Sequence, residues 1–319
     1  MLHVLLLVGS AVAIYFSCEL FVNAVEHLGR LLNVGALAVG TVLAAVGTAL
    51  PESVVTAIAV LNQDTAQIGV GAAMGGPLAL STVAYAVVGI ALLVRRRAMP
   101  SFDAKRLGRD QAAFLGIFAF KVGLGLVAFA WKPWCGLLFF AGYAAYVVIE
   151  LRADDTGDAE ELEPLTLGRS ASPRLAPVLA QTLGTLAVIF VASQVFVAQL
   201  DWAGPQLGLS ASVTALLLAP VATELPEVMN ALIWVRQGKT QLALSNISGS
   251  MMVQATVPSG LGLLFTSWSF DGPLLLSGVV TFVAVAFLLV ALLRGKMGRW
   301  VLAFAGLFYV GFAGLLPFV

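Results

Sequence analysis

GTALPE, residues 47–52, decides the fold of this chain, because the pattern returns as ATELPE at residues 222–227. When residues 17–52 are laid on residues 192–227 without a gap, both stretches end on T-x-L-P-E. The proline of each copy lies inside a long apolar run, where it removes a backbone donor and clashes with the preceding turn. The sequence therefore predicts two related halves, each with an interrupted helix.

The composition indicates a membrane protein. Of the 319 residues, 60% are hydrophobic and 11% are charged, whereas a soluble domain has about 45–50% apolar and about 25% charged residues. The 17 Lys and Arg residues balance the 17 Asp and Glu residues, so the basic excess typical of nucleic-acid-binding proteins is missing. We expect an all-α integral membrane protein that contacts the lipid bilayer and binds no nucleic acid.

Ten segments have the roughly 20 mostly apolar residues that a membrane crossing requires. They are residues 2–25, 35–61, 67–94, 111–130, 133–151, 175–198, 211–236, 240–266, 273–293 and 299–318. An acidic linker at 152–174 separates a first repeat, 1–151, from a second, 175–319. The predicted fold is ten transmembrane helices in two five-helix repeats, with helices 2 and 7 broken. Because each repeat has an odd number of helices, the two copies are inverted relative to each other.

The basic residues predict the orientation, since short loops rich in Lys and Arg stay in the cytoplasm. With both termini outside, the cytoplasmic loops hold nearly all of them: Arg30; Arg95, Arg96, Arg97, Lys105, Arg106 and Arg109; Arg152, Arg169 and Arg174; Arg236 and Lys239; Arg294, Lys296 and Arg299. The group from Arg95 to Arg109 is interpreted as a signal that fixes this topology. The acidic linker then lies in the cytoplasm, and we expect the protein in the cell membrane.

Each predicted break carries a carboxylate, Glu52 or Glu227. A charge at the bilayer centre costs about 2.5–3.5 kcal/mol or more, so such residues are rarely without function. Inverted repeats with interrupted helices at matching positions indicate the substrate site of a secondary transporter. The alternative, a protonated or paired carboxyl that only ties helices together, is disfavoured by the symmetry of the pair.

Other chemistry finds little support in the sequence. Cys18 and Cys135 lie alone in apolar runs, and His3 and His27 are the only histidines, so the usual spacings of zinc sites are missing. The chain also lacks the G-x-x-x-x-G-K-[ST] pattern of nucleotide-binding loops. We therefore expect no enzyme activity, no cofactor and no nucleotide.

Residues 21–52 and 218–252 resemble the two α-repeats of the sodium/calcium exchanger family, within the cation/calcium exchanger superfamily. The resemblance implies a core of broken helices 2, 3, 7 and 8, across which helices 1 and 6 slide for alternating access. It also implies cation ligands that match the family's motifs: Glu52, Glu227, Thr48, Thr223, Asn246 and Ser250. On helix 3 the sequence departs from the family at Ala72, Gly76 and Pro77, and the following polar ligand position is Leu80 in the first half and Gln254 in the second.

These matches and departures predict a cation antiporter. Calcium takes six to eight oxygen ligands with carboxylates among them, so Glu52 and Glu227 with neighbouring oxygens suit one central Ca²⁺. Glu224 adds a carboxylate three residues before Glu227, and like charges this close favour the uptake of a proton by one of them. The counter-ion is therefore H⁺, Na⁺ or both. The alternatives are a monovalent Na⁺/H⁺ antiporter and a scaffold or sensor that has lost transport.

Three further polar residues are candidates for ion binding or gating. Glu19 lies on helix 1 and is interpreted either as an access-path ligand or as part of a polar seam between helices. Asn230 follows Glu227 by one helical turn, which places it on the same face. Gln254 serves either as an ion ligand or as a hydrogen-bonding link between helices.

Overall fold

The computed structural model describes residues 2–61, 66–96, 99, 102–153, 162–168, 173–206 and 217–319. Over these ranges the chain forms helices and contains no strand. The first half comprises α1 (Leu2–Leu31), α2 (Ala36–Ala38), the π-helical turn η1 (Val39–Ala44), α3 (Ala45–Leu61), α4 (Ala66–Ala79), the π-helical turn η2 (Leu80–Ala84), α5 (Tyr85–Val94), α6 (Ala104–Leu126), the 3₁₀ turn η3 (Lys132–Cys135) and α7 (Gly136–Arg152). The second half comprises α8 (Leu175–Gln206), α10 (Ala219–Thr223), α11 (Leu225–Gln237), α12 (Thr240–Phe265), α13 (Gly272–Leu293), α14 (Arg299–Phe304), α15 (Gly306–Leu315) and the 3₁₀ turn η5 (Leu316–Phe318).

The prediction of an all-helical membrane protein is confirmed. Six helical stretches of the described chain are long and apolar enough to cross a bilayer, and a bent pair adds a seventh. The helices that fall outside this set carry polar residues: α6 begins with Lys105, Arg106 and Arg109, and α12 contains Ser245 and Asn246. The number of crossings stays a prediction.

Both predicted interruptions are present. The axis bends by 48° between Ala36–Ala49 and Glu52–Leu61, at the position of Pro51. In the second half the helix stops at Thr223 and restarts at Leu225, with Glu224 between them at φ −84° and ψ 4°. Pro226 lies in the first turn of α11, where a proline costs no backbone hydrogen bond.

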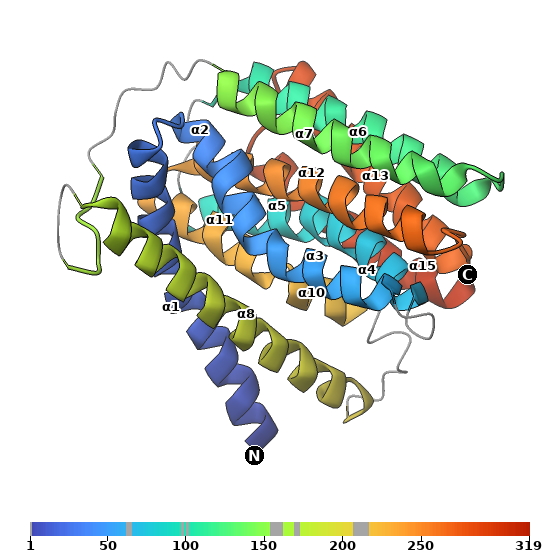
Figure 1. Cartoon of the computed structure of the whole chain (residues 1–319), viewed down its shortest axis with the longest axis horizontal. Coiled ribbons are helices and arrows are strands. Elements are labelled where there is room, and N and C mark those ends of the chain that lie inside the picture. Colours follow the sequence, from blue (N-terminus) through green and yellow to red (C-terminus); the bar gives the residue numbers. More distant parts are fainter. Residues whose placement is uncertain are drawn as a thin grey trace.

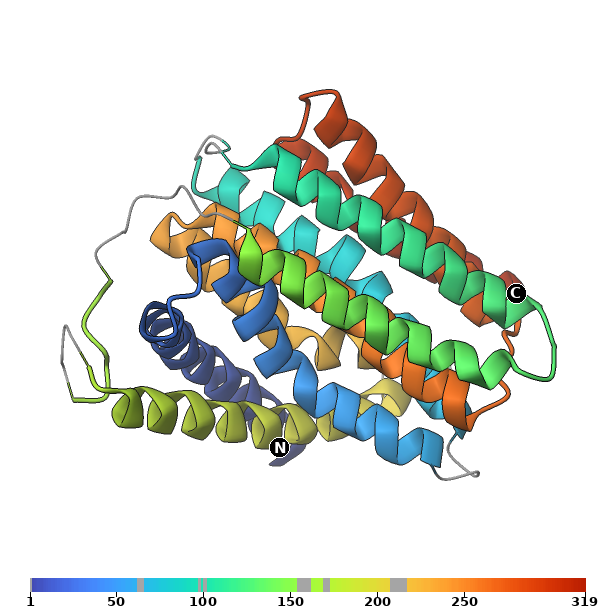
Figure 2. The same ribbon diagram turned by 45° about the horizontal axis from the view of Figure 1, so that its top comes forward.

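α12 is the central helix of the bundle. It packs against α3 and α4 from the first half and against α6, α7 and α11 around it, and most of its side chains from Thr240 to Leu263 are buried. Figures 1 and 2 show α6 and α7 covering one side of the bundle and α1 and α8 lying along another. The central position of α12 brings residues of both halves against one helix.

α1 and α8 form a pair beside the bundle, although they are far apart in the sequence (Figure 1). Near the N-terminus His3 stacks on Trp202 at 4.1 Å, and its Nδ1 lies 2.8 Å from Gln199 Oε1. Towards the other end of α1, Glu26 accepts hydrogen bonds from Trp234 Nε1 at 2.8 Å and Lys239 Nζ at 2.6 Å. The contacts of Glu26 join the pair to the bundle near the C-terminal end of α1.

Part of the predicted linker is fastened to this pair. Asn23 Oδ1 accepts hydrogen bonds from Thr166 N at 3.0 Å and from Gln181 Nε2 at 3.2 Å, and Leu167 N donates to Gln181 Oε1 at 2.7 Å. Residues 154–161 and 169–172 of the linker lie outside the described residues.

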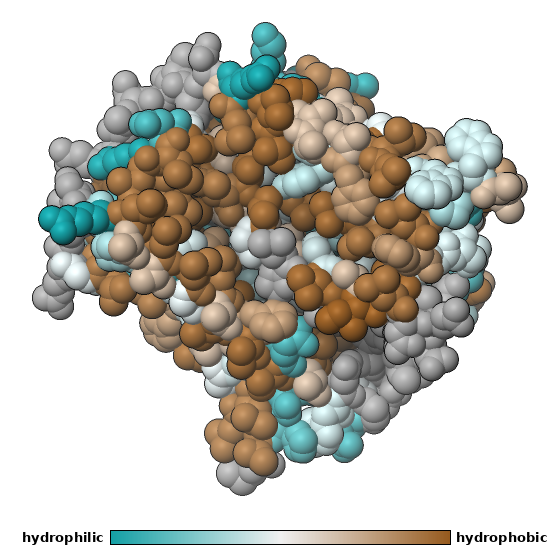
Figure 3. Space-filling view, viewed as in Figure 1, coloured by the Kyte–Doolittle hydropathy of each residue, from teal (hydrophilic) through white to brown (hydrophobic). Residues whose placement is uncertain are grey.

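The surface suits a lipid environment. Hydrophobic side chains cover most of the face seen in Figure 3. Many large apolar residues are exposed, for example Leu5 on α1, Leu138 on α7 and Val191 on α8. An apolar surface of this extent is unfavourable in water, so it supports the integral membrane placement.

Candidate functional site

The two helix breaks bring three carboxylates together. Glu52 follows the bend of α3, Glu224 occupies the junction between α10 and α11, and Glu227 lies in the first turn of α11. Glu224 interacts electrostatically with both Glu52 and Glu227. The first turn of a helix carries a partial positive charge, which stabilises the carboxylate of Glu227 there.

Gln254 of α12 links the two halves of this site. Its Nε2 donates to Glu52 Oε2 at 2.5 Å and to Glu224 Oε1 at 2.7 Å. A side-chain amide has two N–H donors, so each carboxylate receives one of them. Of the two roles predicted for Gln254, the helix-to-helix hydrogen bond is present.

The other polar residues of α12 face the same way. Asn246 Nδ2 donates to the carbonyl oxygen of Glu227 at 3.3 Å. Asn246, Ser250 and Gln254 are spaced four residues apart, which places them on one face of the helix. Because the first and the last of the three contact the carboxylate region, Ser250 faces it as well.

Many oxygens at this site have no hydrogen-bond donor from the described protein. They are Glu224 Oε2, both carboxylate oxygens of Glu227, Asn230 Oδ1, Asn246 Oδ1, Ser250 Oγ and Gln254 Oε1. All six residues are at most 1% exposed. Buried polar atoms are nearly always partnered, so a concentration of unpartnered acceptors is typical of a place that binds a cation.

The carboxylates alone do not form a chelating cluster. The described residues contain no group of three or more His, Cys, Asp or Glu placed to hold a metal ion. A cation at this site needs neutral oxygens as well. Thr48, close to Glu227, and Thr223 offer hydroxyl oxygens whose protons are given to Ala44 O at 3.0 Å and Pro220 O at 3.2 Å.

The structure places the two remaining candidates differently. Asn230 is fully buried one turn after Glu227, and neither of its side-chain polar atoms has a hydrogen-bond partner among the described residues. Glu19 lies on an exposed face of α1. Gln194, which matches it in the alignment of the two repeats, lies on an exposed face of α8. Of the predicted site residues, the structure thus leaves Glu19 outside the central cluster.

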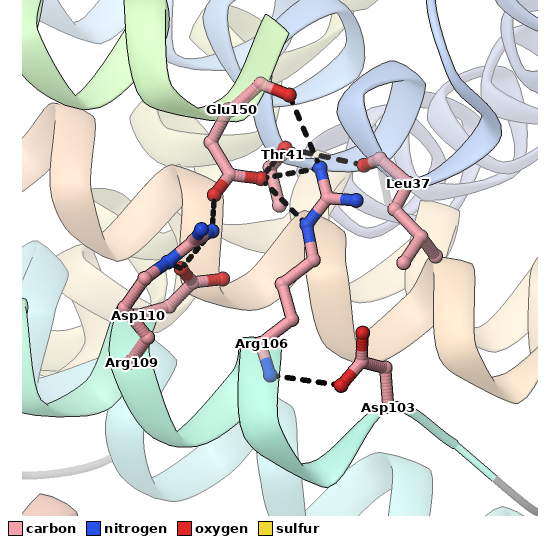
Figure 4. A network of polar contacts seen from close by, with 7 residues as sticks. All are labelled: Leu37, Thr41, Asp103, Arg106, Arg109, Asp110 and Glu150. Carbon is pink, nitrogen blue, oxygen red and sulfur yellow. Dashed lines mark hydrogen bonds and ion pairs between the residues drawn. The ribbon is translucent and has the colours of Figure 1, made fainter. Parts of the chain in front are cut away.

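A second buried polar cluster escaped the sequence analysis (Figure 4). Glu150 of α7 is fully buried and accepts from Arg106 Nη2 at 2.7 Å, from Arg109 Nη2 and from Thr41 Oγ1 at 3.0 Å. Arg106 and Arg109 were interpreted only as loop charges that fix the topology, yet Arg106 is 7% exposed. The carboxylate of Glu150, inside an apolar run, was the signal that should have indicated a buried partner.

Comparison with known proteins bears on this site. The family model described as sodium/calcium exchanger protein matches residues 2–152 and 178–316. A candidate antiporter of Alkalimonas amylolytica, CaxA, is 26% identical over 301 residues, which cover 93% of this chain and 91% of that protein. The inner membrane protein YrbG of Escherichia coli (strain K12) is 27% identical over 277 residues, with 84% and 81% covered.

Among solved structures, the sodium-calcium exchanger NCX_Mj soaked with 2.5 mM Na⁺ and 10 mM Sr²⁺ has the same fold. The TM-score is 0.78 at 20% sequence identity, and the match covers 100% of this chain and 99% of that one.

Proposed function

Because this chain belongs to the sodium/calcium exchanger family, we propose that it is a secondary-active antiporter that exchanges Ca²⁺ for H⁺, Na⁺ or both across the cell membrane. The observation that carries the proposal is the set of unpartnered oxygens around Glu224, Glu227 and Asn246. Oxygen atoms that lack donors inside a protein are suited to a hard cation such as Ca²⁺.

The proposed architecture is ten transmembrane helices in two inverted repeats, residues 1–151 and 175–319. Helices overlap all ten predicted spans. When the repeats are aligned, Pro51 matches Pro226, and the break at Glu224 lies two residues before that position. The distribution of basic residues supports termini outside and the linker 152–174 in the cytoplasm. The breaks then lie near the bilayer midplane, where inverted-repeat transporters bind their ions.

In the proposed mechanism Glu52 and Glu227 neutralise Ca²⁺. Thr48, Thr223, Asn246 and Ser250 supply neutral oxygens, with Asn230 and Gln254 at the border of the site. Either Ca²⁺ or protons remove the buried negative charge, and only a neutralised core lets the apolar pair α1–α8 move across it at low cost, because an unpaired buried charge is expensive. The two ions therefore alternate.

The proton is the favoured counter-ion. On α4 the positions facing this region include Gly75 and Gly76, which offer no side-chain oxygen for Na⁺, whereas Glu224 provides a third carboxyl group. The third carboxyl group of Glu224 also favours a second candidate function, a monovalent Na⁺/H⁺ antiporter. In that case the three carboxylates bind Na⁺ in place of Ca²⁺.

The test is Ca²⁺ uptake into proteoliposomes with an outward Na⁺ gradient, an outward H⁺ gradient or neither. We expect uptake with the H⁺ gradient, and its loss in Glu227→Gln. Glu163→Gln is the matched control, because this exposed glutamate uses only its backbone carbonyl in the contact with Asn23.

Each outcome decides between the candidates. Uptake with the Na⁺ gradient alone would make Na⁺ the counter-ion. An absence of Ca²⁺ uptake, combined with Na⁺-driven proton movement, would replace Ca²⁺ exchange by Na⁺/H⁺ antiport. No ion movement under any gradient would contradict transport altogether.

A further inference from the structure

Gly76 of α4 lies directly against the bridge between the two halves of the site. A Cβ atom added at Gly76 would lie 2.6 Å from Gln254 Oε1 and 2.7 Å from Glu224 Oε1. Cβ atoms in real structures essentially never come within 3.0 Å of such neighbours. The space of a side chain at position 76 is thus filled by oxygens that come from two other helices.

The neighbouring glycine, Gly75, packs against α10, the helix that immediately precedes Glu224. A Cβ atom at Gly75 would lie 2.7 Å from Cγ of Pro220, in the first turn of α10. α10 ends at Thr223, so its contact with Gly75 sets the place where Glu224 emerges. Gly71, one turn earlier on α4, has nothing within 4 Å of an added Cβ. Close packing therefore favours glycine at position 75, and a methyl group at position 76 would displace the side-chain ends of Gln254 and Glu224. Position 71 has room for a methyl group among the described residues.

We propose that Gly76 determines the ion specificity of the site, because it admits the carboxyl group of Glu224 as a third acidic group. The proposal rests on the antiport function proposed above. Glu52 and Glu227 balance one divalent ion, so Glu224 demands a further positive charge, a proton or a monovalent cation. Gly76 acts as a positioning residue and does not itself contact an ion.

The surroundings of Glu224 support this charge balance. Glu52 from α3 and Glu227 from α11 are the titratable groups that act on it electrostatically. α12 contributes the neutral amide of Gln254, and α4 contributes glycine. Ion pairs of the described residues lie away from Glu224, for example those of Arg106 and Arg109 with Glu150, of Arg109 with Asp110 and of Lys239 with Glu26.

The experiment compares Gly76→Ala, Glu224→Ala, the double variant and the control Gly71→Ala in the proteoliposome assay. Overpacking by one methyl group in a rigid site is expected to lower Ca²⁺ uptake by about tenfold in Gly76→Ala, with Gly71→Ala within about twofold of the unchanged protein. Once Glu224 is truncated, Gln254 can shift into the freed space. The double variant should therefore match Glu224→Ala.

Two further readouts separate specificity from packing. Gly76→Ala should change the pH profile of uptake in the same way as Glu224→Ala, whereas a purely structural role would lower the rate without altering the profile. The unfolding temperatures of the four purified variants should show the same pattern. Gly76→Ala should lower the unfolding temperature on its own but not in the Glu224→Ala background.

Equal behaviour of Gly76→Ala and Gly71→Ala, or an undiminished effect of Gly76→Ala in the Glu224→Ala background, would overturn the proposal. If the unchanged protein moves no Ca²⁺, the proposed Ca²⁺ exchange fails, while the unfolding data still test the contact of Gly76 with Glu224.

Discussion

Lys121 Nζ of α6 lies 2.6 Å from the carbonyl oxygen of Ala73 in α4. Ala73 stands four residues before Pro77, whose nitrogen has no proton to give to that carbonyl. The lysine is fully buried, with its ammonium 5.2 Å from the centroid of the Phe118 ring. It supplies the hydrogen bond that the proline removes from the helix.

This relationship predicts that Lys121→Met lowers the thermal stability of the protein. A buried carbonyl left without a donor costs about 1–3 kcal/mol. In a Pro77→Ala background the residue at 77 regains its N–H, and the loss caused by Lys121→Met should be smaller. Unfolding temperatures of the four proteins in detergent measure the difference, and equal losses in both backgrounds would contradict the explanation.

The cluster around Glu150 predicts an order of stability effects. Glu150→Gln removes the shared partner of two arginines, and breaking a buried ion pair costs about 3–5 kcal/mol. Arg106→Ala should destabilise more than Arg109→Ala, because the Arg109 side chain is 41% exposed and the Arg106 side chain 7%. Asp103→Asn, a change at the N-cap of α6, serves as a mild control. The reverse order of the two arginine variants would contradict the explanation by exposure, and no loss in Glu150→Gln would show that the cluster adds little to stability.

We expect Glu224→Ala to change the dependence of Ca²⁺ uptake on pH. In the proposed mechanism protons and Ca²⁺ compete for the same carboxylates. Ca²⁺ uptake by the unchanged protein should therefore fall as the pH falls on the side where Ca²⁺ enters. Removal of one competing carboxyl should make this fall shallower. Initial uptake rates across a pH series test the prediction, and an identical slope in both proteins would exclude Glu224 as a proton carrier.

The variant Asn230→Leu tests whether Asn230 serves ion binding or the stability of the fold. Both polar atoms of Asn230 are buried without a hydrogen-bond partner in the part of the chain that the structure describes. Replacing such a group by an apolar one of similar size is close to neutral or stabilising. We expect unchanged or higher stability without Ca²⁺ and a smaller Ca²⁺-induced rise in unfolding temperature. A loss of stability without Ca²⁺ would mean that Asn230 serves the fold.

The helix breaks were predictable because their cause is local. Pro51 and Pro226 act on their own turns, and the accompanying Glu52 and Glu227 are visible in the same six residues. The bridge through Gln254 was not predictable, since it depends on how α3, α10 and α12 pack. Glycine repeats in α4 and arginines near α6 are compatible with several roles in a sequence, and only the contacts of Gly76 with Glu224 and of Arg106 with Glu150 distinguish them.

Glu19 shows the limit of helical spacing. Helical spacing sets Glu19, Asn23 and Glu26 along one side of α1, but spacing does not reveal which neighbour covers that side. Asn23 binds the linker and Gln181, Glu26 binds Trp234 and Lys239, and Glu19 is exposed.

The contacts of α1 and α8 leave a long stretch of the pair between its attachment to the bundle at Glu26 and its far end at His3. At the His3 end the two helices hold each other, while Glu26 fixes α1 to the bundle through Trp234 and Lys239. At 1.5 Å per residue, the arm from Glu26 to His3 is about 35 Å long. A tilt of about 10° about Glu26 moves the His3 end by about 6 Å, roughly the pitch of one helical turn. A small tilt about the contacts of Glu26 with Trp234 and Lys239 thus displaces the far end of the pair sideways by several ångströms.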